Sequence, residues 1–214
     1  SLLNGCLPPT TAIGSNGQSI QDAKIGNISN PRFDVKTQRK QMDLLQNANR
    51  DLLQRHEPNS ELEGVIESYE LAFRMQSAVP ELMDLKDETQ QTMKMYGIGQ
   101  KQTDDFGQMC LMARRFAEAG VRYIELTHEG WDQHSGLKAR LTSNCGATDK
   151  PIAGLIADLK QRDMLKDTLI IWGGEFGRTP AAKKDDGRDH NSTGFSVWMA
   201  GGGVKGGMRY GATD

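Results

Sequence analysis

The sequence predicts an α/β fold in which a mainly parallel sheet is flanked by helices, with a helical hairpin inserted or appended. Three observations predict this arrangement. Apolar residues recur at three- and four-residue spacing across 37–79, helix-like and strand-like segments alternate after residue 104, and the run at 168–172 is almost wholly apolar. An alternating order of helices and strands is typical of a parallel sheet with helical cover.

Composition and pattern divide the chain into three regions. Residues 1–36 are rich in Gly, Asn and Pro and show little periodicity, so we expect an irregular segment there. Residues 37–96 are predicted to form a helical hairpin region. Residues 97–214 are predicted to form an α/β core in which the loops at the strand ends hold the functional site.

The helical region contains two amphipathic patterns separated by Pro58. The first has an apolar face at Met42, Leu45, Ala48 and Leu52. The second begins at Ser60, with Glu63 placed for a capping box, and Pro80 is predicted to end or kink it. We interpret the hairpin as a packing or partner surface, because its pattern contains no group of residues with an evident chemical role.

Helices and strands alternate in the last region. A helix is expected up to Gly120, with an apolar stripe at Phe106, Met109, Cys110, Ala113 and Phe116. Residues 121–127 alternate like a strand, and Asp149 followed by Pro151 is expected to start the next helix. The apolar face of that helix is Ile152, Leu155, Ile156 and Leu159.

Two more strands are expected near the end of the chain. The run at 168–172 is typical of a strand buried on both faces, and 195–200 is a further strand candidate. In open parallel sheets, ligands bind beyond the carboxyl ends of the strands. We therefore expect a functional site in the loops after residues 127, 172 and 200.

Length, charge and cysteine content exclude several classes of protein. The chain has 214 residues, for which one domain is the default, and its net charge of −2 leaves no basic footprint for nucleic acid. No stretch approaches the ~20 apolar residues of a membrane-spanning helix. The three cysteines fit no zinc motif and indicate no compartment. No signal peptide is visible, and the sequence does not indicate an oligomeric state.

Three of the four histidines fall in the loops after predicted strands, each beside a carboxylate. The candidate residues are His128, Glu129, Asp132 and His134 in one loop, and Glu175, Arg178, Arg188, Asp189 and His190 farther along. Carboxylates and imidazoles together are ligands of Zn²⁺ or Mn²⁺, and Arg178 is placed to clamp an oxyanion. The alternative interpretation is a surface ion pair between Glu175 and Arg178, with an ordinary loop at 189–190.

These loops carry motifs that resemble a known family. The motifs are WDQH at 131–134, GGEFGRTP at 173–180, GRDH at 187–190 and the segments 194–198 and 210–214, with SYELAFRMQ at 68–76. Over most of residues 37–214 the chain resembles the bacterial DUF1501 family. The resemblance implies the alkaline-phosphatase-like superfamily, which includes the sulfatases. That superfamily implies an α/β/α sandwich, here incomplete, with one or two divalent metal ions at strand ends.

The resemblance also implies roles for individual residues. Asp132 with His134 matches one metal-binding pair of the superfamily, and His190 matches a later histidine ligand. Glu175-Phe176 stands where the superfamily has an Asp-His pair, so one ligand is kept in kind and the other is lost. The implied metal ligands are Asp132, His134, Glu175, Asp189 and His190, and the implied substrate-binding residues are Arg178, Arg188 and His128. The cofactor would be Zn, Mn, Ca or Mg.

Three functions follow from these observations. The first is a metal-dependent hydrolase of sulfate or phosphate esters, acting on a small molecule or a polysaccharide. The second is a binding or scaffold protein that retains the fold without the chemistry, and the third is an interaction module built on the helical hairpin. The resemblance implies that the chain is a fragment, that the nucleophile lies upstream of it, and that the protein is exported.

Overall fold

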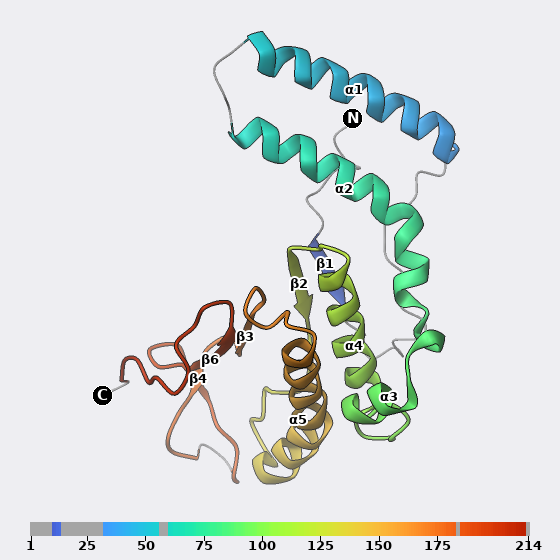
Figure 1. The fold of residues 1–214 in the computed structure, drawn as a ribbon. Helices are drawn as coiled ribbons and strands as arrows, with labels where there is room; N and C mark the ends of the chain where they lie inside the picture. Colours follow the sequence, from blue (N-terminus) through green and yellow to red (C-terminus); the bar gives the residue numbers. More distant parts are fainter. Residues whose placement is uncertain (1–9, 14–31, 56–59, 183–184, 213–214) are drawn as a thin grey trace.

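The structure is a computed structural model that describes residues 10–13, 32–55, 60–182 and 185–212. Helices dominate it (Figure 1). The helices are α1 (Val35–Arg55), α2 (Ser60–Met83), the 3-10 helix η3 (Leu85–Asp87), α3 (Gln90–Tyr96), α4 (Asp104–Glu118) and α5 (Leu137–Gln161). The strands are β1 (Thr10–Ile13), β2 (Tyr123–Leu126), β3 (Leu169–Gly173), β4 (Gly177–Arg178), β5 (His190–Asn191) and β6 (Val197–Gly201).

The predicted mainly parallel sheet is wrong. Within the described ranges the strands form three two-stranded sheets, of which β1–β2 is parallel and both β3–β6 and β4–β5 are antiparallel. A parallel pair needs a crossover connection, usually a helix, whereas an antiparallel pair can be joined by loops. The described residues between β3 and β6 contain the β4–β5 pair and no helix, so the chain returns antiparallel to β3.

The expectation that the run at 168–172 is buried on both faces is also wrong. In β3 the side chains of Leu169, Ile171 and Trp172 are 48%, 60% and 48% exposed, and only Ile170 packs against the core. Among the residues that the structure describes, β3 pairs only with β6, with Leu169 opposite Gly201 and Gly173 opposite Val197. An apolar sequence shows that a strand can be buried, but burial needs layers on both faces, and the described residues do not cover both faces of this two-stranded sheet.

The core is built on α4, which lies beside α5 and α3 (Figure 1). The predicted apolar stripe is confirmed, because all five of its residues are buried. Two glycines let the helices approach closely. A Cβ on Gly107 would lie 2.5 Å from the carbonyl oxygen of Tyr96, and one on Gly154 would lie 2.7 Å from that of Met95. Both α4 and α5 therefore pack directly against the backbone of α3.

The end of α4 is confirmed at Gly120, which has a φ of 88°. Its N–H donates to the carbonyl of Ala117, and the N–H of Val121 donates to that of Phe116, each at 3.0 Å. These two bonds satisfy carbonyls that the helix end leaves open, as in a Schellman motif. The chain then leaves α4 in the direction of β2.

The predicted helix start at Asp149 and Pro151 is wrong, because α5 already begins at Leu137 and contains Pro151. Proline lacks the N–H that would bond the carbonyl four residues earlier, but its fixed φ suits a helix. Pro151 is fully buried, so packing offsets the lost hydrogen bond. The predicted apolar face is confirmed in part: Leu155 and Leu159 are buried, and Ile152 packs against the core.

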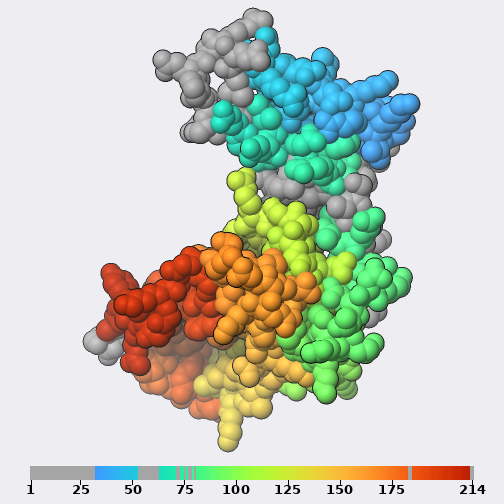
Figure 2. All heavy atoms as spheres, viewed as in Figure 1, coloured from blue at the N-terminus to red at the C-terminus, as the bar shows by residue number. Residues whose placement is uncertain are grey.

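α1 and the first part of α2 lie side by side, apart from α3, α4 and α5 (Figure 1), and Figure 2 shows them as a separate lobe. The last turns of α2 reach α4, and Val79 is part of the core. The side-chain amide of Gln46 donates to the carbonyl of Ile66 at 2.9 Å, and Arg39 pairs with Glu70 at 2.7 Å. The second helix continues through Pro80 to Met83, so Pro80 does not end it. Pro58 and most of 1–36 lie outside the described residues.

No helix in the described part of the chain has the length and apolar character needed to cross a membrane.

Candidate metal site

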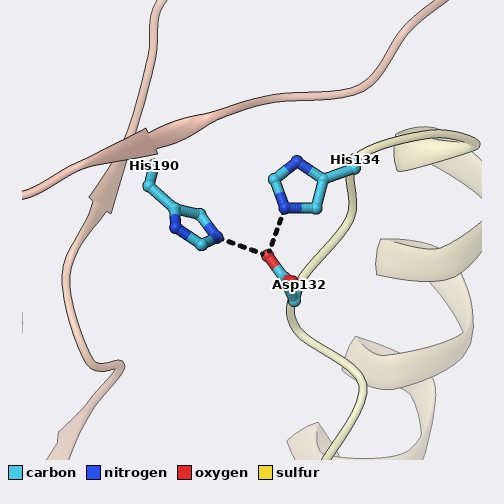
Figure 3. A group of neighbouring side chains, drawn as sticks. All are labelled: Asp132, His134 and His190. Atoms are coloured by element: carbon cyan, nitrogen blue, oxygen red, sulfur yellow. Dashed lines mark hydrogen bonds and ion pairs between the residues drawn. The ribbon is translucent and has the colours of Figure 1, made fainter.

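Three side chains of the predicted set come together between the β2–α5 loop and β5. Asp132 and His134 lie in the loop, and His190 projects from β5 toward them (Figure 3). Their candidate ligand atoms lie within 4.8 Å of one another. The loop is the one predicted after residue 127, although the expected sheet is absent.

Both imidazoles face a single oxygen atom. Nε2 of His134 lies 3.1 Å from Oδ1 of Asp132, and Nε2 of His190 lies 3.0 Å from the same Oδ1. The hydrogen bond with His190, and then the one from Arg178, hold the pKa of Asp132 below its ordinary value. The carboxylate is therefore ionised at neutral pH and available as a ligand.

The segment that carries His190 is docked on the Asp132 loop by backbone contacts. The N–H of Arg188 donates to the carbonyl of Gln133 at 3.0 Å, and the carboxylate of Asp186 accepts a hydrogen bond from the N–H of Lys138 at 3.2 Å. A Cβ on Gly187 would lie 1.8 Å from the carbonyl oxygen of His134, so only glycine fits there. This docking brings His190 to His134 across 56 residues of sequence.

The short β4–β5 ladder places Arg178 opposite His190. Thr179 extends the pairing, because its N–H donates to the carbonyl of Asp189 at 2.9 Å and its hydroxyl oxygen accepts from the N–H of Asp189 at 3.1 Å. A Cβ on Gly177 would lie 1.7 Å from the carbonyl oxygen of Gly194. Backbone pairing thus fixes the positions of the two Cα atoms from which the side chains of Arg178 and His190 project.

Arg178 joins the cluster through its guanidinium. Nη1 donates to Oδ1 of Asp132 at 2.5 Å, and Nη2 donates to Oε1 of Glu175 at 3.3 Å. The guanidinium carbon lies 5.4 Å from the centroid of the Phe176 ring. The same ring lies 4.6 Å from the imidazole of His190, so Phe176 supports both basic side chains.

The donor set fits a divalent cation. Around a tetrahedral Zn²⁺ with bonds of about 2.0–2.1 Å, neighbouring ligand atoms are about 3.3 Å apart, close to the separations from Asp132 to each imidazole. Two imidazoles and one carboxylate also leave a coordination position open. The side chains of Asp132, His134 and His190 are 54%, 48% and 47% exposed, so that position would be accessible from solvent.

The other predicted site residues lie around this cluster in different ways. Glu175 pairs with Arg178, and Oδ1 of Asp189 lies 3.9 Å from Nδ1 of His134 while accepting the N–H of His190. The guanidinium of Arg188 donates to the carbonyls of Asp186 and Gly187. The structure therefore brings Arg178, Glu175 and Asp189 to the cluster, and it directs Arg188 to backbone carbonyls.

His128 has a packing environment. Its Nδ1 accepts a hydrogen bond from Nε1 of Trp131 at 3.1 Å, and its ring packs edge-on against Phe106 at 5.3 Å. Burial lowers its pKa, so the neutral ring is favoured. Trp131 in turn contacts Trp172 of β3. These contacts tie the start of the Asp132 loop to the core.

Sequence reasoning missed the residues that hold the two loops together. Gln133 is buried and donates to the carbonyl of Gly130 at 2.8 Å, and Asp186 binds the start of α5. The sequence shows a glycine at 187, directly before the Arg-Asp-His motif. It does not show that this glycine lies against the carbonyl of His134. No local pattern links Asp186 with Lys138, because 48 residues separate them.

The model of the family described as "Protein of unknown function (DUF1501)" matches residues 4–214. No curated protein and no solved structure is significantly similar to the chain.

Proposed function

We propose that this chain, which belongs to the DUF1501 family, binds a divalent cation through Asp132, His134 and His190 and hydrolyses sulfate or phosphate esters with it. The observation that carries the proposal is the convergence of two imidazole nitrogens on one oxygen of an ionised, half-exposed carboxylate. A site of this kind holds a metal ion while leaving room for a water molecule or a substrate oxygen.

The donor set favours some metals over others. Imidazole suits Zn²⁺ coordination, whereas Mn²⁺, Ca²⁺ and Mg²⁺ prefer shells made of oxygen atoms. Two of the three donors are imidazole nitrogens. We therefore expect Zn²⁺ to bind more tightly than Mn²⁺, Ca²⁺ or Mg²⁺.

Each residue has a defined part in the proposed reaction. Asp132, His134 and His190 would hold the ion, and Arg178 would bind the anionic oxygens of the ester. The bound ion would polarise the ester and lower the pKa of a water ligand. Hydrolysis adds one water molecule, breaks one bond of the sulfate or phosphate ester and releases an alcohol and the inorganic anion. We assign no protein nucleophile.

The class of substrate rests on the family resemblance together with the cationic group at the site. Membership of the alkaline-phosphatase-like superfamily remains part of this proposal, and its support is the match of Asp132, His134 and His190 to that superfamily's ligand pattern. The fold lends no support, because the mainly parallel sheet was a wrong prediction.

A second candidate function is binding without turnover. Phe176 stands where the superfamily pattern has a histidine ligand, and its ring packs 4.6 Å from His190. A second metal ion is therefore not supported on that side. A one-metal site that recognises an anionic ligand without hydrolysing it is consistent with this packing.

Metal binding is tested first. Zinc and manganese are titrated into the protein and into D132N and H190A, and bound metal is counted by mass spectrometry. We expect about one equivalent, lost in both variants. The matched control is D105N, which removes an exposed carboxylate from the start of α4. Unchanged metal content in D132N and H190A would contradict the proposal.

Turnover separates the two candidate functions. The metal-loaded protein is offered aryl sulfate and aryl phosphate esters, with D132N as the inactive reference. Hydrolysis that needs Asp132 supports the enzyme. Stoichiometric metal together with binding of sulfate or phosphate but no hydrolysis supports the binding protein instead.

A further inference from the structure

Building on the proposed metal site, we infer that Arg178 couples metal binding to oxyanion binding. In this arrangement the guanidinium occupies the oxygen of Asp132 that faces the metal position until an oxyanion draws the guanidinium away. An anionic substrate and the metal ion then strengthen each other's binding.

The argument begins with the crowding at one oxygen atom. Oδ1 of Asp132 is contacted by Nη1 of Arg178 at 2.5 Å and by the Nε2 atoms of His190 and His134 at 3.0 and 3.1 Å. A carboxylate oxygen has about two lone-pair directions. An ion bonded to both imidazoles would take the place of their contacts with Oδ1, and the guanidinium would then share this oxygen with the ion. The guanidinium and the ion therefore compete for the same carboxylate oxygen.

Charge leads to the same conclusion. Arg178 is permanently cationic, and a divalent ion at Oδ1 would lie within a few ångströms of its guanidinium. Like charges at that separation repel each other, although solvent weakens the effect at an exposed site. Arg178 in its present position thus competes with the metal for Asp132.

The guanidinium has two other groups within reach, the carboxylate of Glu175 and the ring of Phe176. Nη2 already lies 3.3 Å from Oε1 of Glu175, and the guanidinium can also pack on the ring of Phe176. The backbone of Arg178 is held in β4 opposite His190. A rotation of the side chain alone would therefore free Oδ1 and leave the guanidinium beside the open metal position, where it can pair with an oxyanion.

Thermodynamic linkage turns this geometry into a measurable effect. If sulfate binding releases Asp132 for the metal, sulfate tightens metal binding, and the metal tightens sulfate binding by the same factor. Without Arg178, the competition disappears and so does the response to sulfate.

The experiment is a zinc titration of the whole chain, read by competition with a chromophoric chelator. The proteins are wild type, R178Q and R140Q, each with sodium sulfate or with sodium chloride at equal ionic strength. Arg140 lies exposed at the start of α5, so R140Q removes the same charge outside the pair with Asp132. R178M is a second variant in case R178Q fails to fold, and circular dichroism checks folding of every protein.

The expected result has two parts. R178Q binds zinc about 3- to 10-fold more tightly than wild type in chloride, as expected for removal of one exposed ion pair and its charge, while R140Q changes little. Sulfate tightens zinc binding to wild type and R140Q by at least about 2-fold and leaves R178Q unchanged.

Other results overturn the inference and separate it from the metal site itself. Equal or weaker zinc binding by R178Q, or a sulfate effect retained in R178Q, shows that Arg178 does not couple the two ligands, while the metal site stands. Absence of zinc binding in wild type and in the folded Arg178 variants contradicts the proposed function, and with it this inference.

Discussion

Two aspartates in this molecule are each contacted by arginine, and they differ in burial. Asp158 on α5 is completely buried, and it contacts Tyr96 at 2.9 Å, Arg162 at 2.8 Å and Arg114 at 3.0 Å. Asp132 at the candidate site is 54% exposed and contacts Arg178 and two histidines. Both aspartates therefore pair with an arginine, one inside the core and the other at the surface.

The difference in burial changes how costly it is to break the contacts of each aspartate. Burial by itself raises the pKa of Asp158, but hydrogen bonds from Arg162, Tyr96 and Gln161 outweigh it, so the pKa lies below its ordinary value. Removing one member would leave other polar groups buried without a partner. The carboxylate of Asp132 is already hydrated in part, so its partners can exchange at little cost. The difference separates a buried structural ion pair from the exposed carboxylate of the proposed metal site.

The largest effect is expected at Asp158. D158A should lower the free energy of unfolding by about 3–5 kcal/mol, because Arg114 and the hydroxyl of Tyr96 lose a buried partner. Denaturation by urea, followed by circular dichroism, measures this. The reference is D132N, for which we expect a loss below about 1 kcal/mol. Equal losses in the two variants would remove the contrast.

The second effect compares two apolar segments. Leu159 of α5 is 1% exposed, whereas Ile171 of β3 is 60% exposed. L159A should destabilise the protein by about 2–5 kcal/mol through the cavity it leaves. I171A should change stability by about 0.5 kcal/mol or less. The same urea experiment tests both, and a large loss in I171A would show that β3 is covered in solution.

The third effect is on zinc affinity, and it compares a substitution at Asp132 with one at Asp158. D132N should weaken zinc binding by at least about 100-fold, because the amide is a poorer ligand than the ionised carboxylate it replaces. Chelator competition measures this affinity. D158N serves as a second control if it folds, because Asp158 lies in the core and should leave zinc affinity within about 3-fold of wild type.

The smallest effect is a pH dependence from His128. Its folded pKa is lowered, chiefly by burial, so the unfolded chain takes up the proton more readily. The stabilisation is fully present above the unfolded pKa of about 6.5 and is lost as the pH falls toward the folded value. Stability should therefore fall more steeply from pH 7 to pH 5 in wild type than in H128Q. Parallel curves from urea titrations across this range would contradict the assignment.

Local patterns were sufficient for α4. The spacing of Phe106, Met109 and Phe116 identified the buried face of α4, and Gly120 marked its end, because both depend on residues within a few turns of one another. The start of α5 was misplaced because a proline was read as a first-turn residue, although packing allows Pro151 inside the helix.

Pairing between strands was beyond those patterns. The sequence of an apolar, extended segment such as β3 does not indicate which strand it pairs with, or whether the pair is parallel or antiparallel. The antiparallel pair with β6 was therefore not predicted. At the candidate site, some features were predicted from the sequence and others were not. The residue types were predicted, and the family resemblance grouped Asp132, His134 and His190, but the short strands that hold Arg178 and His190 and the shared contact with one oxygen of Asp132 were not predicted.

The sequence by itself determined the buried face and the end of α4, the candidate metal ligands and the family, since these depend on local spacing and motif. Tertiary structure alone decided the strand directions, the exposure of β3 and the meeting of Asp132 with His190, 58 residues apart. That meeting depends on backbone contacts such as those of Gly187 and Arg188 with the Asp132 loop. Such contacts join groups through space, and no periodicity along the chain encodes them.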